Sequence, residues 1–196
     1  MFDQLALMMV MMWPAIPMFL IQLHFAVDFW KKLGIWTYFV SVLEWLPIAF
    51  IIYTFQSAIL CYIIALSFPF FVLGVLAIAA GIVLHSWTAK LLGLKATIGL
   101  TEIESDTKSE RQGLVTSGPF SVVRHPSYWA HTSILIGFFL ITGVISVGAI
   151  VIIDLAITYF ITTKLEDQEL VKRFGKQYIE YQMKVPRLFP RVIKRT

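Results

Sequence analysis

Long apolar stretches separated by three short basic segments dominate the pattern of this chain. The run from residue 5 to residue 27 is long enough to cross a bilayer as a helix, although Pro14 and Pro17 interrupt it. Residues 35–89 contain a single formally charged side chain, Glu44, and have the length of two crossings. The pattern therefore predicts three membrane spans in the first half of the chain.

Turn residues divide the remaining apolar sequence. Within the second stretch, the connection between spans is expected near residues 53–57 or near residues 67–69. Residues 128–163 carry no Lys or Arg, and turn signals at 142–143 and 146–148 separate two helices of about 15 to 18 residues. These two helices are the predicted fourth and fifth spans.

All sixteen Lys and Arg residues lie in three segments, at 28–34, 90–127 and 164–196. Five crossings place these segments on one face of the membrane, and the positive-inside rule makes that face cytoplasmic. The topology accounts for the net charge of +4. The nine basic residues after Thr163 can also attract anionic lipid. Nucleic acid is therefore not an expected partner.

Composition agrees with a membrane protein, because 58% of the residues are hydrophobic, 14% are charged and the mean hydropathy is +0.78. The single cysteine, Cys61, excludes an internal disulfide. No Cys-rich or His-x-x-x-His spacing supports a metal. The first apolar run lacks the positive leader of a signal peptide, so we expect it to be retained as a span.

We expect two regions, an N-terminal three-span membrane region over residues 1–92 and a catalytic region over residues 93–196. The catalytic region begins with a cytoplasmic loop, in which residues 101–111 have the alternating charges of a solvated surface. Gly113 and Gly118-Pro119 then punctuate a short apolar piece, whose backbone groups are candidates to face a ligand.

The tail predicts an amphipathic helix. Apolar residues recur at 3-4-3-4 spacing, which favours packing against the membrane or the span ends; they are Val171, Phe174, Tyr178, Tyr181 and Val185. Gly175 indicates a bend or a close approach within this helix. Glu166 and Arg173 share another face about 10 Å apart, a separation that can hold a small group.

Polar residues inside the spans have a structural interpretation. Glu44 and Asp154 lie well inside their spans, where a charge is costly, so at least one is expected to be protonated or hydrogen-bonded. They share a proton if spans two and five touch, and a structural contact is favoured over catalysis. We expect His24 and His85 at the membrane interface, whereas His131 is a candidate to support the site.

The ordered motifs of the second half resemble a known family. They are Leu114-Val115-Thr116-Ser117-Gly118, Arg124-His125-Pro126-Ser127-Tyr128, Glu166-Asp167, Phe174-Gly175, Tyr178, Tyr181 and Val185-Pro186. Set around a two-span hairpin, they resemble the isoprenylcysteine carboxyl methyltransferases, which belong with the phospholipid N-methyltransferases to a wider group of integral membrane methyltransferases. The resemblance covers roughly the last 85 residues.

This resemblance implies an all-α integral membrane protein with about five transmembrane helices, which uses S-adenosylmethionine to methylate a lipidic acceptor. The sequence agrees, since no Gly-x-Gly-x-x-Gly follows a strand as in soluble Rossmann enzymes. The resemblance implies that the cofactor is lined by Gln112, Gly113, Leu114, Val115, Phe120, His125, Pro126, Ser127 and Tyr128. It assigns Glu166 to the substrate side, and Arg173 is the candidate clamp for the acceptor.

Two departures from the family pattern leave the acceptor open. The paired Glu-Glu of the family is Glu166-Asp167 here, which makes Asp167 the less certain member. A basic residue one turn earlier is replaced by Thr162, so Lys164 or Arg173 has to substitute for it. The preferred acceptor is the C-terminal carboxylate of a prenylated cysteine or a similar isoprenoid, and the alternative is a phospholipid amine.

The chemistry of methyl transfer separates these acceptors. An in-line displacement from a sulfonium mainly requires alignment and exclusion of water. A carboxylate is already ionised and needs an orienting cation such as Arg173, whereas an amine or thiol must lose a proton, which gives Glu166 a base role. A prenyl or acyl chain can enter sideways between helices while the cofactor arrives from the cytoplasm.

Two other functions remain open at this point. NADPH-dependent sterol-type reductases share a related Arg-His and Tyr arrangement, but they are usually longer and carry Asn at the position of Ser127. A non-enzymatic membrane scaffold or channel predicts that Glu166 and His125 are dispensable. We expect membrane lipids as partners, no obligate protein partner, and an active site on the cytoplasmic face of the plasma membrane in a prokaryote or of the endoplasmic reticulum in a eukaryote.

Overall fold

The chain forms an α-helical bundle in a computed structural model that describes residues 2–103 and 113–190. Within these ranges there is no strand, and the only β-type pairing is an isolated bridge between Ile63 and Val144. The α-helices are α1 Phe2–Met12, α2 Ala15–Phe25, α3 Val27–Leu33, α4 Trp36–Thr54, α5 Gln56–Ile59, α6 Phe68–Leu92, α7 Leu94–Thr97, α8 Leu100–Ile103, α9 Pro126–Thr142, α10 Ile145–Ile157, α11 Thr163–Phe174 and α12 Lys176–Lys184. A 3₁₀ turn, η1, covers Gly118–Ser121, and a π-helical turn, η2, covers Thr158–Thr162. The predicted all-α class is confirmed.

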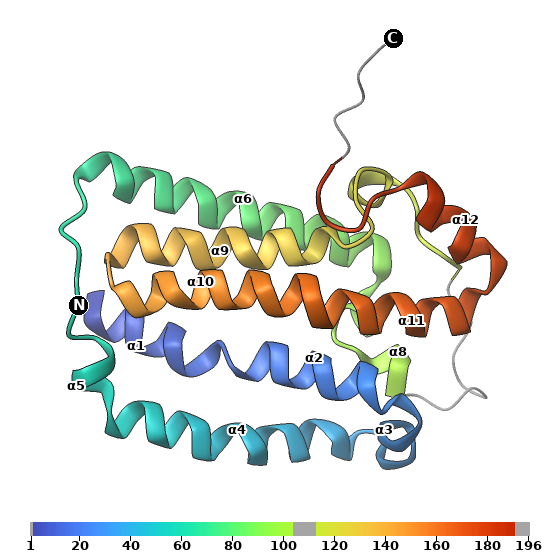
Figure 1. Ribbon diagram of the computed structural model, residues 1–196, viewed down its shortest axis with the longest axis horizontal. Coiled ribbons are helices and arrows are strands. Elements are labelled where there is room, and N and C mark those ends of the chain that lie inside the picture. The colour runs from blue at the N-terminus through green and yellow to red at the C-terminus, as the bar shows by residue number, and fades with distance from the viewer. Residues whose placement is uncertain (1, 104–112, 191–196) are drawn as a thin grey trace, which may run out of the picture.

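Four helical stretches are long and apolar enough to span a membrane, namely Phe2–Phe25, Trp36–Thr54, Phe68–Leu92 and Ile145–Phe174. Helix α9 has 17 residues, about 26 Å of helix, and lies between α6 and α10 (Figure 1). All five expected helices are therefore present as neighbouring rods, and four of them have the length of a span. The crossing of the membrane by α9 stays a prediction.

Three details of the predicted spans differ from the structure. Both expected turn regions fall within one connection, because α4 ends at Thr54 and α6 begins at Phe68, with only the short α5 between them. The turn signal at 146–148 is wrong, since these residues lie inside α10. The fifth helix is much longer than expected, because η2 joins α10 to α11 without a break.

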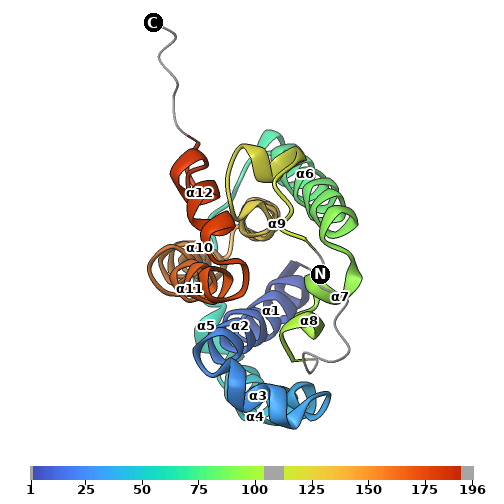
Figure 2. The same ribbon diagram turned by 90° about the vertical axis from the view of Figure 1, so that its right-hand side faces the viewer.

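Small residues bring α6 and α9 into close contact (Figure 2). A Cβ atom added to Gly74 would lie 2.8 Å from the carbonyl oxygen of Gly137, and one added to Gly81 would lie 2.7 Å from that of Ala130. Side chains at these positions would force the backbones apart, as at close helix crossings in membranes. The small residues therefore fix where α9 begins relative to the end of α6.

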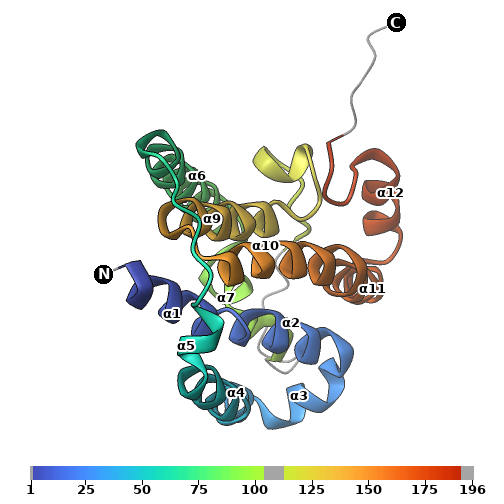
Figure 3. The same ribbon diagram turned by 60° about the vertical axis from the view of Figure 1, so that its left-hand side comes forward.

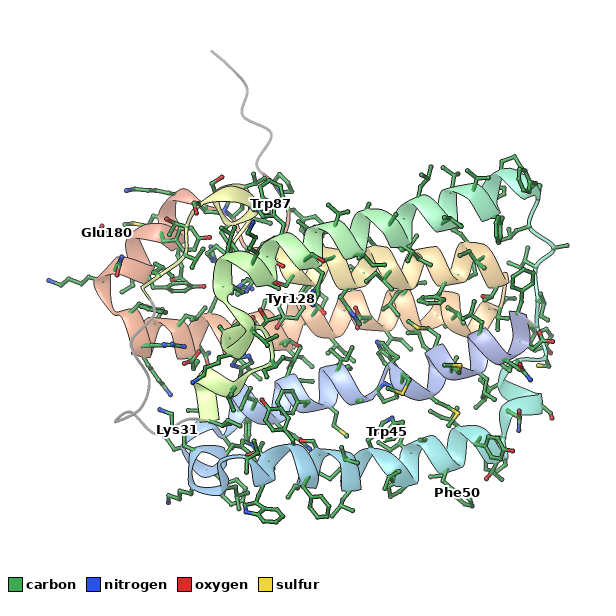
Figure 4. The ribbon with its side chains drawn as sticks, turned by 180° about the vertical axis from the view of Figure 1, so that it is seen from behind. Lys31, Trp45, Phe50, Trp87, Tyr128 and Glu180 are labelled. Carbon is green, nitrogen blue, oxygen red and sulfur yellow. The ribbon has the colours of Figure 1, made fainter. Side chains whose placement is uncertain are left out.

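Elements that carry the basic segments gather at one end of the bundle. Helices α3, α7, α11 and α12 lie at that end, whereas α5 and the α9–α10 turn lie at the other (Figure 1). Figure 4 shows Lys31 and Glu180 at the basic end and the exposed Phe50 pointing away from the bundle near the opposite end of α4. The structure thus has the one-sided charge distribution that the predicted topology requires.

Candidate functional site

The loop before α9 and the segment after α12 lie side by side at the basic end of the bundle (Figure 3). The backbone N–H of Arg124 donates to the carbonyl of Pro186 at 2.9 Å, and that of His125 donates to the carbonyl of Arg187 at 3.2 Å. The indole of Trp129 donates to the carbonyl of Leu188 at 2.6 Å. These three hydrogen bonds hold the loop that leads into α9 against the segment that follows α12.

Local sequence explains how the loop presents His125. Pro126 is the first residue of α9, and a residue that precedes proline avoids helical dihedral angles. His125 accordingly has φ −123° and ψ 64°, and its ring is buried between the helix start and α11. Proline therefore ends the loop at the residue whose side chain enters the site.

Asp167 on α11 is the centre of a buried polar cluster. One carboxylate oxygen, Oδ2, accepts from Arg124 Nη2 at 2.7 Å and from Arg187 Nε at 2.9 Å. The other, Oδ1, accepts from the Tyr178 hydroxyl at 2.6 Å and lies 2.9 Å from His125 Nε2. Only 5% of the Asp167 side chain is exposed, so this single carboxylate joins the loop, α11, α12 and the tail.

His125 bridges the two acids that the motif contains. Its Nδ1 lies 3.1 Å from Glu166 Oε2, and its Nε2 faces Asp167. Burial alone would lower the pKa of His125, but the charge of Glu166 and the hydrogen bond to Asp167 outweigh it and raise the pKa to about 9. The ring is therefore an imidazolium at neutral pH, with both nitrogens available as donors.

The two carboxylate oxygens of Glu166 differ in their contacts. Its Oε2 also accepts from the Tyr128 hydroxyl at 2.9 Å, while 26% of the Glu166 side chain is exposed. Within the described residues its second oxygen has no hydrogen-bond partner. This leaves one carboxylate oxygen to face a ligand.

Arg124 and Tyr181 hold α12 against the loop beside this cluster. Burial opposes the charge of Arg124, but hydrogen bonding to Asp167 and the charge of Asp167 raise the pKa of Arg124 above its usual value. Its Nη1 donates to the Val185 carbonyl at 2.7 Å, at the C-terminal end of α12, where a cation is favoured. Burial raises the pKa of Tyr181 to about 12, and its hydroxyl donates to the Phe120 carbonyl. At neutral pH Arg124 therefore stays charged and Tyr181 stays protonated, so both remain hydrogen-bond donors.

The predicted apolar stripe packs at this end of the bundle. Tyr178, Tyr181 and Val185 form a buried cluster with Val171, Phe174, Leu170 and Leu114. Gly175 has φ 57° and separates α11 from α12, so the predicted bend is confirmed. The apolar stripe thus packs against α11, at the end of the fifth predicted span, as expected. It also packs against the loop that contains Leu114.

The cofactor residues that the resemblance implies are distributed along this loop. Gln112 lies outside the described residues. Gly113 and Leu114 begin a segment without regular structure, whose backbone makes no hydrogen bond to a strand or helix within the described ranges, and a Cβ at Gly113 would meet no atom within 4 Å. Val115 follows Leu114 in this segment, and Phe120 is buried in η1.

The remaining expected cofactor residues surround the polar cluster. Pro126 is buried at the start of α9, and Ser127 is partly buried beside it. Open backbone groups, apolar side chains and an acidic oxygen fit S-adenosylmethionine, which carries hydrogen-bonding, aromatic and sulfonium groups. The residues present therefore suit this cofactor.

The two proposed acceptor residues differ in position. Glu166 belongs to the polar cluster, whereas Arg173 is exposed on the last turn of α11, with its guanidinium 5.2 Å from the centre of the Phe174 ring. Thr162 is buried, and Lys164 is exposed with its ammonium 5.9 Å from the Phe160 ring. The clamp role of Arg173 stays a prediction.

Sequence reasoning left several residues of the cluster out of the expected site, namely Arg124, Asp167, Tyr178 and Arg187. The family pattern makes Asp167 the less certain acid because aspartate replaces glutamate, yet the shorter side chain lies where the loop and tail converge. A signal for Arg187 was present, since this cation directly follows Val185-Pro186. The sequence does not indicate that Arg187 pairs with Asp167, because this contact depends on how the tail folds back against α11.

The two acids within the apolar helices, the buried Asp154 and the exposed Glu44, have separate partners. Asp154 Oδ1 accepts from Trp13 Nε1 at 2.8 Å and lies 3.3 Å from His131 Nε2. Glu44 accepts from the Gln22 amide. The shared proton between Glu44 and Asp154 is therefore not supported, and His131 lies against Asp154 instead of the polar cluster.

An apolar recess of about 90 Å³ adjoins the polar cluster. Tyr128 and Thr132 of α9 line one side, and Thr158 and Tyr159 of η2 line another, with Phe189 of the tail. Tyr128 links this recess to Glu166 through its hydroxyl. Since π-helical turns often accompany functional sites, the position of η2 here agrees with a ligand pocket.

Comparisons with known proteins agree with the resemblance read from the motifs. The sequence profile of the phospholipid methyltransferase family matches residues 69–177. A protein-S-isoprenylcysteine O-methyltransferase of Xenopus laevis is 35% identical over 123 residues, which are 61% of this chain and 40% of that protein. The human protein of the same name is 33% identical over 92 residues, which are 45% of this chain and 31% of that protein.

A further relative has a different name. The cobalt-zinc-cadmium resistance protein CzcN of Cupriavidus metallidurans is 34% identical over 79 residues, 40% of this chain and 36% of that protein.

The chain thus spans about two fifths or less of the length of these curated relatives. No solved structure gives a significant match. Because the family profile covers α6 through the start of α12, more than half of the sequence, the chain belongs to the phospholipid methyltransferase family.

Proposed function

We propose that this chain is an S-adenosylmethionine-dependent methyltransferase that acts on a lipidic acceptor at the cytoplasmic surface of a membrane. The observation that supports it most is the bridge from His125 to Glu166 and Asp167, which joins the loop to α11 beside an apolar recess. Family membership and the names of the relatives support the same reaction class. We further propose that residues 93–196 form the catalytic region.

The donor side of the site would be formed by the loop. Gly113, Leu114 and Val115 offer backbone groups and apolar side chains, and Phe120 and the His125–Tyr128 element close the opposite side. When bound, S-adenosylmethionine supplies an electrophilic methyl group on a sulfonium. Glu166 would lie on the acceptor side, because His125 and Tyr128 fix one of its oxygens and leave the other open.

The polar cluster contributes alignment and exclusion of water. Asp167 holds the loop and tail together through four partners, so that the reacting groups meet in one geometry. Buried tyrosine rings of α12 and Leu114 of the loop pack together over the cluster. Water is thereby kept from the charged groups, which strengthens their interactions.

Two acceptor classes suit this arrangement. The names of the isoprenylcysteine O-methyltransferases support a prenylated cysteine carboxylate, for which Arg173 would be the orienting cation. The open oxygen of Glu166 favours an amine, because a carboxylate acceptor beside it would be repelled. In either case the apolar recess between α9 and η2, about 90 Å³ in volume, is suited to the part of the hydrocarbon chain next to the reacting group.

Binding and transfer assays test the proposal directly. Protein purified in lipid nanodiscs is titrated with S-adenosylhomocysteine and with NADPH, and is then incubated with labelled S-adenosylmethionine and three acceptors: a prenylated cysteine analogue, an aminophospholipid and an isoprenoid acid. We expect S-adenosylhomocysteine to bind, NADPH not to bind, and label to enter at least one acceptor. Binding of NADPH alone would instead support a reductase. Binding of neither molecule, with no transfer, would support a non-enzymatic protein.

A further inference from the structure

The tail that follows α12 forms one wall of the apolar recess. Leu188 and Phe189 line the recess together with residues of α9, α10 and η2. The family profile ends at residue 177, so these two side chains lie outside the matched segment, whereas Tyr128 and Glu166 lie inside it. A wall built from outside the matched segment can differ between members of the family without altering the chemistry that they share.

Polar contacts fix the position of this part of the tail. The carbonyls of Pro186 and Arg187 accept hydrogen bonds from two N–H groups of the loop before α9. The Nε of Arg187 donates to Asp167 at 2.9 Å, and the indole of Trp129 donates to the carbonyl of Leu188 at 2.6 Å. Three consecutive residues are thus held against the loop, α9 and α11, so the side chain that follows them has a defined place.

Phe189 borders the open side of the recess. Its ring centre lies 5.6 Å from that of Trp129 at an interplanar angle of 83°, and 5.8 Å from that of Tyr159 at 53°. Both are favourable geometries for aromatic pairs. Phe189 and Tyr159 are 57% and 39% exposed, whereas Thr158 and Leu188 are buried. The recess therefore has a closed inner wall and an outer opening between two aromatic rings.

The size of the recess limits what it can hold. Its volume of about 90 Å³ is well below the roughly 300–1,000 Å³ of pockets that enclose a whole drug-sized ligand. Only a short part of a hydrocarbon chain fits, and the rest has to leave through the opening between Tyr159 and Phe189. At the inner end, the hydroxyl of Tyr128 is bonded to Glu166 of the polar cluster. A chain that begins near this acid therefore passes Phe189.

Building on the methyltransferase proposed above, we propose that Phe189 is a specificity-determining residue, which together with Leu188 sets the bulk of the hydrocarbon chain that the site accepts next to the reacting group. A difference of one methylene in an apolar pocket changes selectivity about 10–200-fold. Removal of the Phe189 ring widens the opening, whereas a larger side chain at Leu155, which lines the recess from α10, narrows the interior. The two changes should therefore shift selectivity in opposite directions.

The test compares two cysteine carboxylates of equal main-chain length. N-acetyl-S-farnesylcysteine has methyl branches on its chain, and N-acetyl-S-dodecylcysteine has none. Dissociation constants for both compounds and for S-adenosylhomocysteine are measured in nanodiscs, together with methyl transfer. We expect Phe189→Ala to shift the ratio of the two dissociation constants toward the branched compound by at least about tenfold, with unchanged affinity for S-adenosylhomocysteine. Leu155→Phe should shift the ratio the other way.

Phe50→Ala is the matched control, because Phe50 is an exposed phenylalanine of α4 that lies far from the recess (Figure 4). It should keep the selectivity of the wild type. A selectivity shift in Phe50→Ala equal to that in Phe189→Ala would overturn the specific role of the tail.

The remaining outcomes separate this inference from the proposed function. Unchanged selectivity in both recess variants would overturn the role of Phe189. Binding of S-adenosylhomocysteine but of neither cysteine compound by the wild type would overturn the recess as a chain site and leave the methyltransferase standing. Failure of the wild type to bind S-adenosylhomocysteine would overturn the proposed function itself. Loss of that binding in Phe189→Ala would assign the tail to the donor side and overturn its role in acceptor selectivity.

Discussion

The two ends of the bundle are held together by different kinds of interaction. At the basic end, charged side chains of the loop and the tail and a tyrosine hydroxyl of α12 meet at Asp167 of α11. At the opposite end, backbone groups join the connection before α6 to the α9–α10 turn, with Ile64 N donating to Gly143 O at 2.8 Å and Ile145 N to Tyr62 O at 3.0 Å. An apolar cavity of about 370 Å³ lies beside this second junction. The comparison shows that both ends fix the same hairpin, the basic end through titratable side chains and the opposite end through backbone amides and carbonyls.

Removing Asp167 should have the largest effect at the basic end. Asp167→Ala leaves Arg124, Arg187 and His125 without their shared partner, and breaking a buried ion pair costs about 3–5 kcal/mol. We expect a large fall in melting temperature and loss of S-adenosylhomocysteine binding. Asp28→Ala on the exposed surface of α3 is the control and should change neither. Unchanged stability of Asp167→Ala would contradict the central position of this residue.

The charge of His125 makes stability at the basic end depend on pH. Its pKa is raised from 6.5 to about 9 in the folded protein, so the folded state holds a proton that the unfolded state releases between these values. This contribution is fully present below pH 6.5 and is lost as pH rises through about 9. Melting temperatures measured from pH 6 to pH 10 should fall across that window. The His125→Gln variant should lack this component of the decline.

Substitution of Gly143 should destabilise the opposite end without affecting the cofactor. Gly143 has φ 66°, and a Cβ at this position would collide with the carbonyl oxygen of Ile64. We expect Gly143→Ala to cost about 1–3 kcal/mol while S-adenosylhomocysteine affinity stays constant. Unchanged stability of Gly143→Ala would contradict the close approach between Gly143 and Ile64.

Arg173 should give the smallest change in stability. It is exposed on the last turn of α11, so Arg173→Ala should alter the free energy of unfolding by less than about 0.5 kcal/mol. For a prenylated cysteine carboxylate, we expect an increase in KM of about tenfold, equivalent to about 1.4 kcal/mol. For an amine acceptor the KM should not rise, because a guanidinium repels an ammonium. Equal weakening of S-adenosylhomocysteine binding would contradict an acceptor-specific role.

The recess beside Tyr128 was only partly foreseeable. The motif identified Tyr128 and Glu166, and the structure joins them by a hydrogen bond. The π-helical turn that lines the recess has no signal in the hydropathy pattern, because Thr158–Thr162 continue an apolar run. Its position follows from how α10 packs against α9, which depends on contacts between residues distant in sequence.

The sequence by itself determined the helices, their order and the end of the bundle at which charge collects. Long apolar runs specify helices locally, Gly175 specifies a bend, and Pro126 specifies the start of α9. Only the tertiary structure decided that Asp167 is central and that Arg187 joins it. The physical reason is that both relations depend on the packing of separate helices and on the path of the tail, which no local pattern of residues encodes.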